Sequence, residues 1–462
     1  MAETAGTPYD LVILGGGSGG YACAFRASLL GMRVALIDKD KLGGTCLHRG
    51  CIPTKALLHA AEVADQSRES QHFGIKTSFD GIDMAAVNAY KDGIVAKKYK
   101  GLQGLAKARG VDFIEGEGRL AGPGAVEVNG KRYDGRHIVL ATGSAPKSLP
   151  GLTIDGDRII SSDHALTLDY VPNSVVVLGG GVIGVEFASV WRSFGAEVTI
   201  IEALPHLVPT EDEDSSKLLE RAFRRRGIAF EVGARFAGVE QTENGVRVST
   251  ENGKQFDAEL LLVAVGRGPV SDDLGFAEAG VELERGFVKV DQYCQTNIPT
   301  VSAIGDLIPT LQLAHVGFGE GILVAERLGG LNPAPIDYDG VPRVTFCEPE
   351  VASMGITEAG AKERYGADGV VAYTFNLAGN AKSEILHTSG AVKVVQQKEG
   401  PVVGIHMVGS RVGELVSEAQ LIYNWEAVPT DVAQLIHMHP TQGEAIGEAH
   451  LALAGKPLHA LS

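Results

Sequence analysis

The sequence predicts an α/β protein in which two doubly wound parallel sheets precede a C-terminal α+β domain. Three observations lead to this prediction. A strand, a glycine-rich turn, a helix and a second strand follow one another in residues 9–38 and again in residues 174–202. Each copy is followed later by an apolar strand that ends in glycine and proline, in residues 138–146 and 261–269. From about Val341 strand-like runs alternate with helical ones, which is typical of an antiparallel α+β domain.

Length and composition exclude several classes of protein. The chain has 462 residues, of which 44% are hydrophobic and 21% charged, so it can bury a large core and is not globally disordered. The net charge of −16 argues against a nucleic-acid partner, because phosphate contacts need a basic surface. The sequence contains no apolar run of about 18 residues and no targeting peptide at its start, so we expect a cytoplasmic protein without membrane contact.

The first repeat carries glycines at G-x-G-x-x-G spacing, namely Gly15, Gly17 and Gly20. In this pattern the first glycine permits a tight turn, the second lets the backbone approach a pyrophosphate, and the third lets helix and strand pack closely. The N-terminus of the following helix supplies N–H groups and a partial positive charge to the phosphates. Asp38, at the end of the next strand, is placed to bind a ribose hydroxyl. This unit is therefore expected to bind a dinucleotide.

The second repeat places the same residue types at the same spacing. Gly179, Gly181 and Gly184 form the glycine turn, and Glu202 follows the first of them by 23 residues, as Asp38 follows its own. One such pattern alone is often only a tight turn, whereas two copies with an acid at equal offset predict two Rossmann-like units. A carboxylate at this position repels a 2′-phosphate, and residues 203–209 contain no arginine, so NAD is favoured over NADP.

A pair of cysteines lies directly after the first repeat. Cys46 and Cys51 are five residues apart in the segment GGTCLHRGCIPTKAL, and Pro53 suggests that Cys51 begins a helix. A helix N-terminus lowers the pKa of a thiol and favours the reactive thiolate. We favour redox chemistry over a structural disulfide, a zinc half-site or two buried thiols, and we expect no metal, because no second cysteine pair exists. The three other cysteines are expected to be packing residues: Cys23, Cys294 and Cys347.

Taken together, the two units and the C-x4-C pair resemble the FAD-dependent pyridine nucleotide–disulfide oxidoreductases. The resemblance runs from about Tyr9 to about Leu458, and its most specific parts are the cysteine segment and HMHPTQGEA near the C-terminus. It implies two Rossmann-like domains, for FAD and NAD, and a C-terminal α+β dimerisation domain in a homodimer. Within the family the chain is most similar to members that oxidise protein-bound dihydrolipoyl groups with NAD⁺.

The resemblance also implies how the chain divides and which residues hold the cofactors. The expected divisions are an FAD-binding domain, an NAD-binding domain entered by a linker at 150–173, a central domain that completes the FAD site, and an interface domain: 1–150, 151–270, 271–340 and 341–462. NAD would bind at the second glycine turn with Gly266. FAD would bind at the first turn with these further residues: Gly44, Thr45, Lys55, Thr142, Gly143, Ser144 and Asp306.

For catalysis the resemblance assigns the two thiols different partners. Cys46 matches the thiol that meets the substrate, and Cys51 matches the thiol that lies against the flavin. Lys55 matches a lysine near the flavin, and Glu186 matches its ion-pair partner beside the nicotinamide. The chemistry needs a proton carrier as well, because a dithiol attacks a disulfide only as a thiolate.

A histidine near the C-terminus matches this proton carrier. His439 corresponds to the family's acid–base histidine, which the other subunit supplies, and Glu444 corresponds to the carboxylate that orients it. The residues alone leave His439 ambiguous, because His437 lies two positions away and a His-Pro in a loop is often structural.

The implied partners are a lipoyl-bearing acyltransferase of a 2-oxo-acid dehydrogenase complex or the carrier protein of glycine cleavage. Two alternative functions remain at this point. The chain could be an NAD(P)H-dependent reductase of a low-molecular-weight disulfide such as mycothiol disulfide, because such a reductase also keeps both thiols. It could also be a non-catalytic component of a multienzyme complex, although a pure scaffold has no need of the thiols, the lysine and the histidine.

Overall fold

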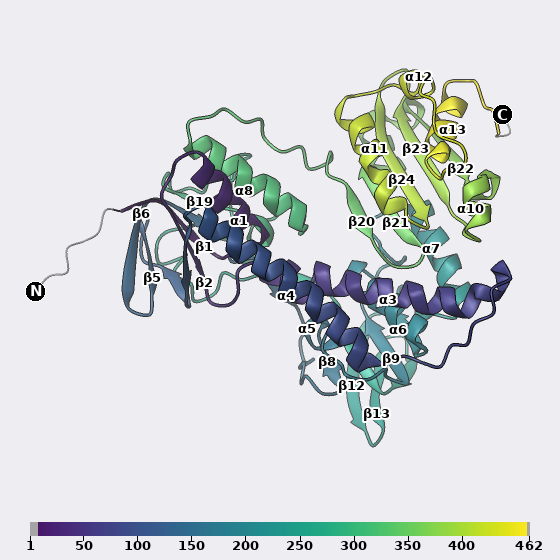
Figure 1. The fold of residues 1–462 in the computed structure, drawn as a ribbon, viewed down its shortest axis with the longest axis horizontal. Helices are drawn as coiled ribbons and strands as arrows, with labels where there is room; N and C mark the ends of the chain where they lie inside the picture. Colours follow the sequence, from purple (N-terminus) through teal and green to yellow (C-terminus); the bar gives the residue numbers. More distant parts are fainter. Residues whose placement is uncertain (1–7, 460–462) are drawn as a thin grey trace, which may run out of the picture. The chain divides into compact units, whose positions relative to one another are not determined.

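The structure is a computed structural model that describes residues 8–459. Contacts within the chain divide it into two units (Figure 1). The first unit consists of Met1–Ala56, Ala85–Lys147 and Gly266–Tyr338, and the second of Leu57–Met84, Ser148–Val265 and Asp339–Ser462. Within the described range, no helix combines the length and the apolar character needed to cross a bilayer.

The first unit is built on a parallel sheet that contains the first glycine repeat. Its strand order is β3-β2-β1-β6, β19 pairs with β6, and the antiparallel strands β5 and β4 extend the sheet beyond β6. Because β1, β2, β6 and β19 are parallel, their carboxyl ends share the edge where ligands bind in such sheets. The strands of this unit are β1 (Tyr9–Leu14), β2 (Val34–Asp38), β3 (Asp112–Glu115), β4 (Gly118–Leu120), β5 (Ala125–Val128), β6 (Lys131–Leu140), β7 (Ser144–Pro146), β16 (Arg267–Pro269), β17 (Leu283–Glu284), β18 (Phe287–Val288) and β19 (Val301–Ala303).

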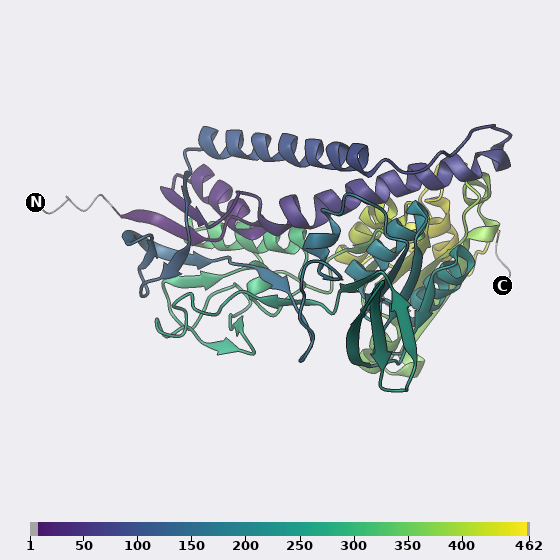
Figure 2. The ribbon, with the colours of Figure 1, turned by 90° about the horizontal axis from the view of Figure 1, so that it is seen from below.

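Two helices of the first unit, α1 and α8, pack side by side (Figures 1 and 2). Glycines make this close approach possible, since a Cβ atom at Gly321 would lie 2.4 Å from the backbone oxygen of Gly19. Helix α3 begins in the first unit and ends in the second. The helical segments are α1 (Ser18–Leu29), α2 (Gly44–Arg49), α3 (Cys51–Glu69), η1 (Ser70–Phe73), α4 (Met84–Ala108), η2 (Gly305–Leu307) and α8 (Ala314–Leu328).

The second unit contains a five-stranded parallel sheet in the order β11-β10-β9-β15-β8. The linker expected at 150–173 is therefore only partly right, because it contains the short edge strand β8, which pairs with β15. The elements of this part are β8 (Ile159–Ile160), α5 (Ser162–Ala165), β9 (Ser174–Leu178), α6 (Val182–Phe194), β10 (Glu197–Ile201), α7 (Glu213–Arg226), β11 (Ala229–Glu231), β12 (Phe236–Thr242), β13 (Gly245–Thr250), β14 (Gln255–Ala258) and β15 (Leu260–Val263).

The C-terminal part of the second unit is an antiparallel sheet in the order β20-β21-β24-β23-β22, as the alternating pattern predicted. Side chains of α11 and α13 form one apolar core with this sheet, and α9 contributes to a smaller one. The elements are β20 (Arg343–Thr345), β21 (Glu350–Gly355), α9 (Glu358–Tyr365), η3 (Ala367–Gly369), β22 (Val370–Asn376), η4 (Leu377–Gly379), α10 (Ala381–Ile385), β23 (Ala391–Gln397), β24 (Val402–Gly409), α11 (Val412–Asn424), α12 (Pro429–Val432) and α13 (Glu444–Leu453).

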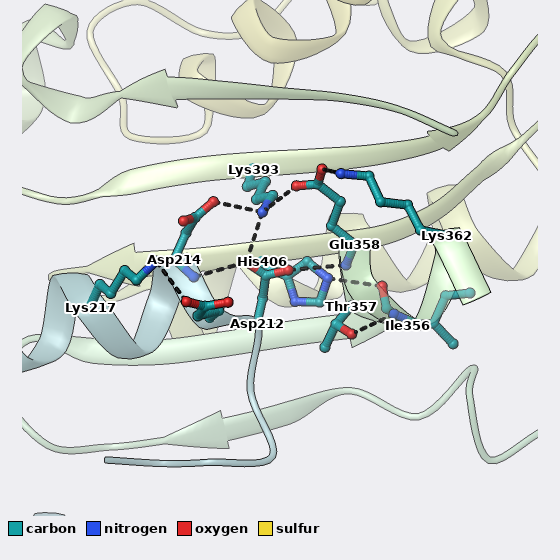
Figure 3. A network of polar contacts seen from close by, with 11 residues as sticks. Asp212, Asp214, Lys217, Ile356, Thr357, Glu358, Lys362, Lys393 and His406 are labelled. Carbon is teal, nitrogen blue, oxygen red and sulfur yellow. Dashed lines mark hydrogen bonds and ion pairs between the residues drawn. The ribbon is translucent and has the colours of Figure 1, made fainter. Parts of the chain in front are cut away.

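A buried polar network links α7 to the C-terminal sheet within the second unit (Figure 3). The Lys393 ammonium of β23 contacts Asp212 at 2.9 Å, Asp214 at 2.7 Å and Glu358 at 2.7 Å. Asp212 also caps α7, because its side chain accepts a hydrogen bond from the Asp214 N–H. His406 of β24 lies beside this cluster and is fully buried. One cation therefore ties the start of α7 to two elements of the C-terminal domain.

Candidate functional site

The first glycine turn leaves room for a dinucleotide at one position and is filled by backbone at two others. Gly15 has φ +113°, and a Cβ atom there would lie 2.1 Å from the backbone oxygen of Ala141. A Cβ atom at Gly20 would lie 1.8 Å from the backbone oxygen of Gly15. At Gly17 the nearest atom would be the Cα of Gly44, at 4.0 Å. Gly15 and Gly20 are therefore required by packing, while Gly17 keeps the approach to the helix N-terminus open, which fits a pyrophosphate.

The second glycine turn repeats this geometry. Gly179 has φ +112°, and a Cβ atom at Gly184 would lie 1.9 Å from the backbone oxygen of Gly179. A Cβ atom at Gly181 would have no neighbour within 4 Å. Each turn thus presents an open glycine and an exposed start of a helix, as binding of a dinucleotide phosphate requires.

Asp38 and Glu202 also accept hydrogen bonds from the backbone of their own glycine turns, a contact that the sequence analysis missed. Asp38 accepts a hydrogen bond from the Gly16 N–H at 2.5 Å, and Glu202 accepts one from the Gly180 N–H at 2.6 Å. The second oxygen of Glu202 accepts the Leu204 N–H at 2.7 Å. A carboxylate has about four acceptor positions, so each acid can also bind a ribose hydroxyl. The equal spacing of acid and glycine was the sequence signal for this contact.

Two of the arginines that follow Glu202 in the sequence have other partners. Arg226 donates hydrogen bonds to Asp65 at 2.9 Å and to Ser193 at 2.7 Å, and the Arg224 guanidinium lies over the Phe230 ring at 4.4 Å. The ribose end of this site is therefore defined by the Glu202 carboxylate, which favours a free 2′-hydroxyl.

Several residues assigned to FAD lie together at the carboxyl ends of β6 and β19. Ser144 donates a hydrogen bond to Asp306 at 2.5 Å, and Arg267 donates to the Ser144 hydroxyl at 2.8 Å. Thr142 donates to the backbone oxygen of Val270 at 2.6 Å. Because Ser144, Thr142 and Asp306 come from segments far apart in the sequence, the fold has gathered them at the edge where the first glycine turn also lies. Their contacts with FAD remain a prediction.

A buried glutamate that the sequence analysis missed supports this edge. Glu320 of α8 is fully buried and accepts hydrogen bonds from the Gly305 N–H at 2.6 Å, Thr310 at 2.8 Å and Tyr338 at 2.9 Å. Burial raises the pKa of its carboxyl group. Glu320 thereby fixes the turn that carries Asp306. A single charged residue on the apolar face of a helix was the signal that could have found it.

The two cysteines of the pair approach each other at a break between two helices. Cys46 lies in α2, Cys51 is the first residue of α3 as predicted, and Gly50 between them leaves the helical conformation. The two thiols are in the reduced form, and a hydrogen bond joins them. That bond and burial raise the pKa of Cys46, while Ser18 and Lys55 act in the opposite direction. Two sulfurs in contact beside a cation can close a disulfide and exchange a proton.

The remaining cysteines are buried, as the packing interpretation predicted: Cys23, Cys294 and Cys347. Over residues 8–459, no group of three or more histidine, cysteine, aspartate or glutamate side chains could hold a metal ion.

His439 and Glu444 form a hydrogen-bonded pair at the start of α13. The His439 Nδ1 lies 2.9 Å from Glu444 Oε1, and the other carboxylate oxygen accepts the Thr441 N–H at 2.8 Å. Burial raises the pKa of Glu444, but the hydrogen bonds from Thr441 and His439 outweigh it and leave the pKa below its usual value. The His439 side chain is 73% exposed. An ionised carboxylate on one ring nitrogen with the ring open to solvent suits proton transfer to an incoming group.

Two of the predicted catalytic residues lie in different units of the structure. Lys55 belongs to the first unit, and Glu186 of α6 belongs to the second. Glu186 is buried and accepts a hydrogen bond from the Phe346 N–H at 2.9 Å. The expected pairing of Glu186 with Lys55 therefore stays a prediction, as does the approach of His439 to the dithiol.

Comparison with known proteins decides the family. Residues 9–321 match the family described as pyridine nucleotide-disulphide oxidoreductase, and residues 341–450 match the dimerisation domain of that family. The chain belongs to the pyridine nucleotide-disulphide oxidoreductases. The predicted family and fold class are thus confirmed. As a member of this family the chain is an oxidoreductase that uses FAD and NAD(H).

Relatives within the family are similar over almost the whole chain. The chain is 40% identical to a dihydrolipoyl dehydrogenase of Bacillus subtilis, with 98% of this chain and 99% of the relative covered. It is 39% identical to a mitochondrial dihydrolipoyl dehydrogenase of Pisum sativum, with 97% and 92% covered. Among solved structures, LpdA from Mycobacterium tuberculosis is similar with a TM-score of 0.89 at 27% identity, covering 96% of this chain and 99% of that one.

Proposed function

We propose that this chain oxidises protein-bound dihydrolipoyl groups to lipoyl groups with NAD⁺ as the electron acceptor. The observation that carries the proposal is the similarity to dihydrolipoyl dehydrogenases over nearly the full length, together with an intact pair of contacting thiols. No observation favours reduction of a low-molecular-weight disulfide or a non-catalytic role.

We assign the roles of the residues from the chemistry of the dithiol and of the family. The dihydrolipoyl dithiol loses two electrons and two protons, and the Cys46–Cys51 disulfide accepts them to become two thiols. A thiolate of the substrate attacks Cys46 and forms a mixed disulfide, which releases Cys51 as the thiolate that would lie against the flavin and that Lys55 would stabilise. The second substrate thiol then attacks the substrate sulfur of the mixed disulfide, which closes the lipoyl ring and releases Cys46. When bound, FAD supplies the two-electron relay from this dithiol to NAD⁺, which takes up a hydride. His439 carries the protons, and Glu444 stabilises its charged form.

The proposal includes a homodimer in which His439 acts on the dithiol of the other subunit. Two observations support this arrangement: the C-terminal domain matches the family's dimerisation domain, and the His439 ring is exposed on that domain. The partner would be a lipoyl-bearing acyltransferase or the glycine-cleavage carrier protein. The cytoplasmic location stays a prediction.

The test is NADH formation from dihydrolipoamide and NAD⁺ by the FAD-loaded protein, with NADP⁺ in a parallel reaction. We expect turnover with NAD⁺ and little with NADP⁺, because Glu202 faces the ribose. A flavin-loaded protein without turnover would contradict the lipoyl assignment. NADH-dependent reduction of small disulfides would then be measured on the same preparation.

A further inference from the structure

The loop between α12 and α13 carries two histidines that point in different directions. The side chain of His439 is 73% exposed, whereas that of His437 is only 15% exposed. The residues on either side of His437 point outward, since Ile436 is 98% exposed and Met438 is 77% exposed. The His437 side chain therefore packs against the protein, whereas the side chains of its two neighbours face solvent.

Three elements hold the His437 ring. Its Nε2 atom lies 2.8 Å from Glu418 Oε1 of α11, and the ring also bonds to the backbone of Leu435. On α13, a Cβ atom at Gly447 would lie 2.5 Å from His437 Nδ1. The ring thus occupies space that exists because residue 447 has no side chain.

The charges around His437 favour its positive form. Glu418 faces it from α11, and Glu444 and His450 face it from α13. The hydrogen bond that His437 donates to Glu418 raises the pKa of His437 and outweighs the opposing effect of burial. Burial lowers the pKa of His450, so His450 stays neutral and adds no positive charge beside His437. A charged imidazole on a carboxylate makes a stronger hydrogen bond than a neutral pair.

Anchors therefore exist on both sides of His439. On one side Thr441 donates its N–H to Glu444 at 2.8 Å, and Asn380 donates to the Thr441 oxygen at 2.9 Å. On the other side stands the pair of His437 and Glu418. We propose that His437 is a positioning residue. Its hydrogen bond with Glu418 holds the loop between α12 and α13 in place, so that His439 keeps its hydrogen bond with Glu444. This inference rests on the proposed function, because it assigns His439 to proton transfer.

The expected effect of losing the anchor is on catalysis and on its pH dependence. An error of about 1 Å in the position of a catalytic group can cost on the order of 100-fold in rate. If His439 leaves Glu444, its charged form loses a hydrogen-bonded carboxylate. Proton transfer with the dithiol then slows, and the pH profile of the dihydrolipoamide reaction changes.

The experiment measures the His437→Gln holoenzyme in two reactions. One is dihydrolipoamide oxidation with NAD⁺ over a range of pH, and the other is NADH oxidation by ferricyanide, which bypasses the dithiol. We expect kcat for dihydrolipoamide to fall by about 10- to 100-fold, with a changed acid limb in its pH profile. The ferricyanide rate should stay at the wild-type value.

Three further variants separate positioning from folding. Gly447→Ala should reproduce the His437→Gln result, although alanine is the better helix former by about 1 kcal/mol, because its methyl group displaces the His437 ring. Glu418→Gln should give a smaller effect, and adding it to His437→Gln should cost little more. Glu414→Gln, an exposed neighbour on α11, is the matched control and should leave both reactions unchanged.

Each failure has its own signature. A wild-type enzyme without dihydrolipoamide turnover would overturn the proposed function. An active wild type with an unchanged His437→Gln rate and pH profile would overturn the positioning role alone. A fall of both reactions together, with the acid limb in place, would also overturn it and assign His437 to general stability.

Discussion

At the scale of single residues, the dithiol is the feature on which the chemistry depends. Cys46 and Cys51 contact each other, and their hydrogen bond together with burial raises the pKa of the Cys46 thiol. Replacing one thiol leaves the flavin and nucleotide sites intact but removes the disulfide that accepts electrons from the substrate.

The Cys51→Ser variant should therefore lose dihydrolipoamide oxidation to background while it keeps bound FAD. NADH oxidation by ferricyanide should continue, because that reaction does not need the dithiol. Cys294→Ala is the matched control, since Cys294 is buried away from the pair, and it should keep both activities. Full lipoyl turnover by Cys51→Ser would disprove the dithiol mechanism.

We predict that Glu202 decides which nucleotide the second site accepts. Its carboxylate holds the Gly180 and Leu204 N–H groups and defines the ribose end of the site. Glu202→Ala removes a hydrogen bond to the ribose, worth about 1.5–3 kcal/mol for a charged acceptor, and removes the repulsion of a 2′-phosphate. The ratio of kcat/KM for NAD⁺ to that for NADP⁺ should fall by about 10-fold or more. An unchanged ratio would place the selectivity elsewhere.

At the scale of elements, the two glycines that begin α6 have separable roles. Gly181 has φ −76° and open space around it, whereas Gly184 touches the backbone of Gly179. Gly181→Ala should fold and bind FAD normally but raise KM for NAD⁺, because a methyl group then faces the pyrophosphate. Gly184→Ala should unfold at lower temperature, because its Cβ atom has no room. Thermal unfolding and NAD⁺ titration of both variants, run in parallel, distinguish the two roles, and equal stability of the two would contradict them.

Elements with a strong local pattern could be predicted from the sequence, and short ones could not. The sequence around α7 has such a pattern, because acidic residues lie in its first turn and arginines in its last turn. Gly227, which follows the last turn, adopts the left-handed conformation that ends many helices. Strand β8 has only two residues, so no alternation can reveal it, and its pairing with β15 joins segments about a hundred residues apart. A local sequence pattern indicates the secondary structure of one segment. The pairing of two strands also depends on which distant segments the fold brings together.

The same distinction applies to the candidate site. The glycine turns and the cysteine pair are local in sequence, and they could be assigned before the structure was known. Glu320 and the pair of His437 and Glu418 act through contacts between different elements. The sequence can mark Glu320 as a charged residue on an apolar helix face, but composition and spacing do not show which donor a buried acid meets, so these contacts emerged only from the fold.

At the scale of the whole molecule, buried charges join parts of the second unit. Lys393 contacts three carboxylates (Figure 3), and these hydrogen bonds raise its pKa although burial acts to lower it. Lys393→Met should reduce the free energy of unfolding by about 3–5 kcal/mol, because it leaves the buried Asp212 carboxylate without its counter-ion. Thermal unfolding at constant FAD concentration measures this loss.

The sign of the pH dependence gives a second check on this cluster. Hydrogen bonds from Lys362 and Lys393 lower the pKa of Glu358, so its stabilising effect is present above its unfolded-state pKa of about 4.3 and is lost in more acidic solution. Without Lys393 the clustered carboxylates repel one another and their pKa values rise. The Lys393→Met variant should then gain stability as the pH falls from 7 towards about 5. A loss over that interval would contradict the ion cluster.

His406 should determine how the second unit responds to mild acid. Burial lowers its pKa to about 4, its Nε2 bonds to the Ile356 oxygen at 3.0 Å, and among residues 8–459 its buried Nδ1 has no hydrogen-bond partner. A histidine with a lowered pKa binds its proton more readily when unfolded, so its stabilising effect is complete above about pH 6.5 and is lost as the pH falls towards 4.

The His406→Gln variant retains a donor for Ile356 but removes the titration. Its unfolding temperature should fall less steeply than that of the wild type between pH 6.5 and about 4, where the shift is worth about 3 kcal/mol. His59→Gln, which replaces an exposed histidine, should follow the wild-type curve. Parallel curves for His406→Gln and the wild type would mean that other titrating groups set the acid sensitivity over this interval. A flatter curve for His406→Gln alone would assign the mild-acid response to the histidine beside the Lys393 cluster.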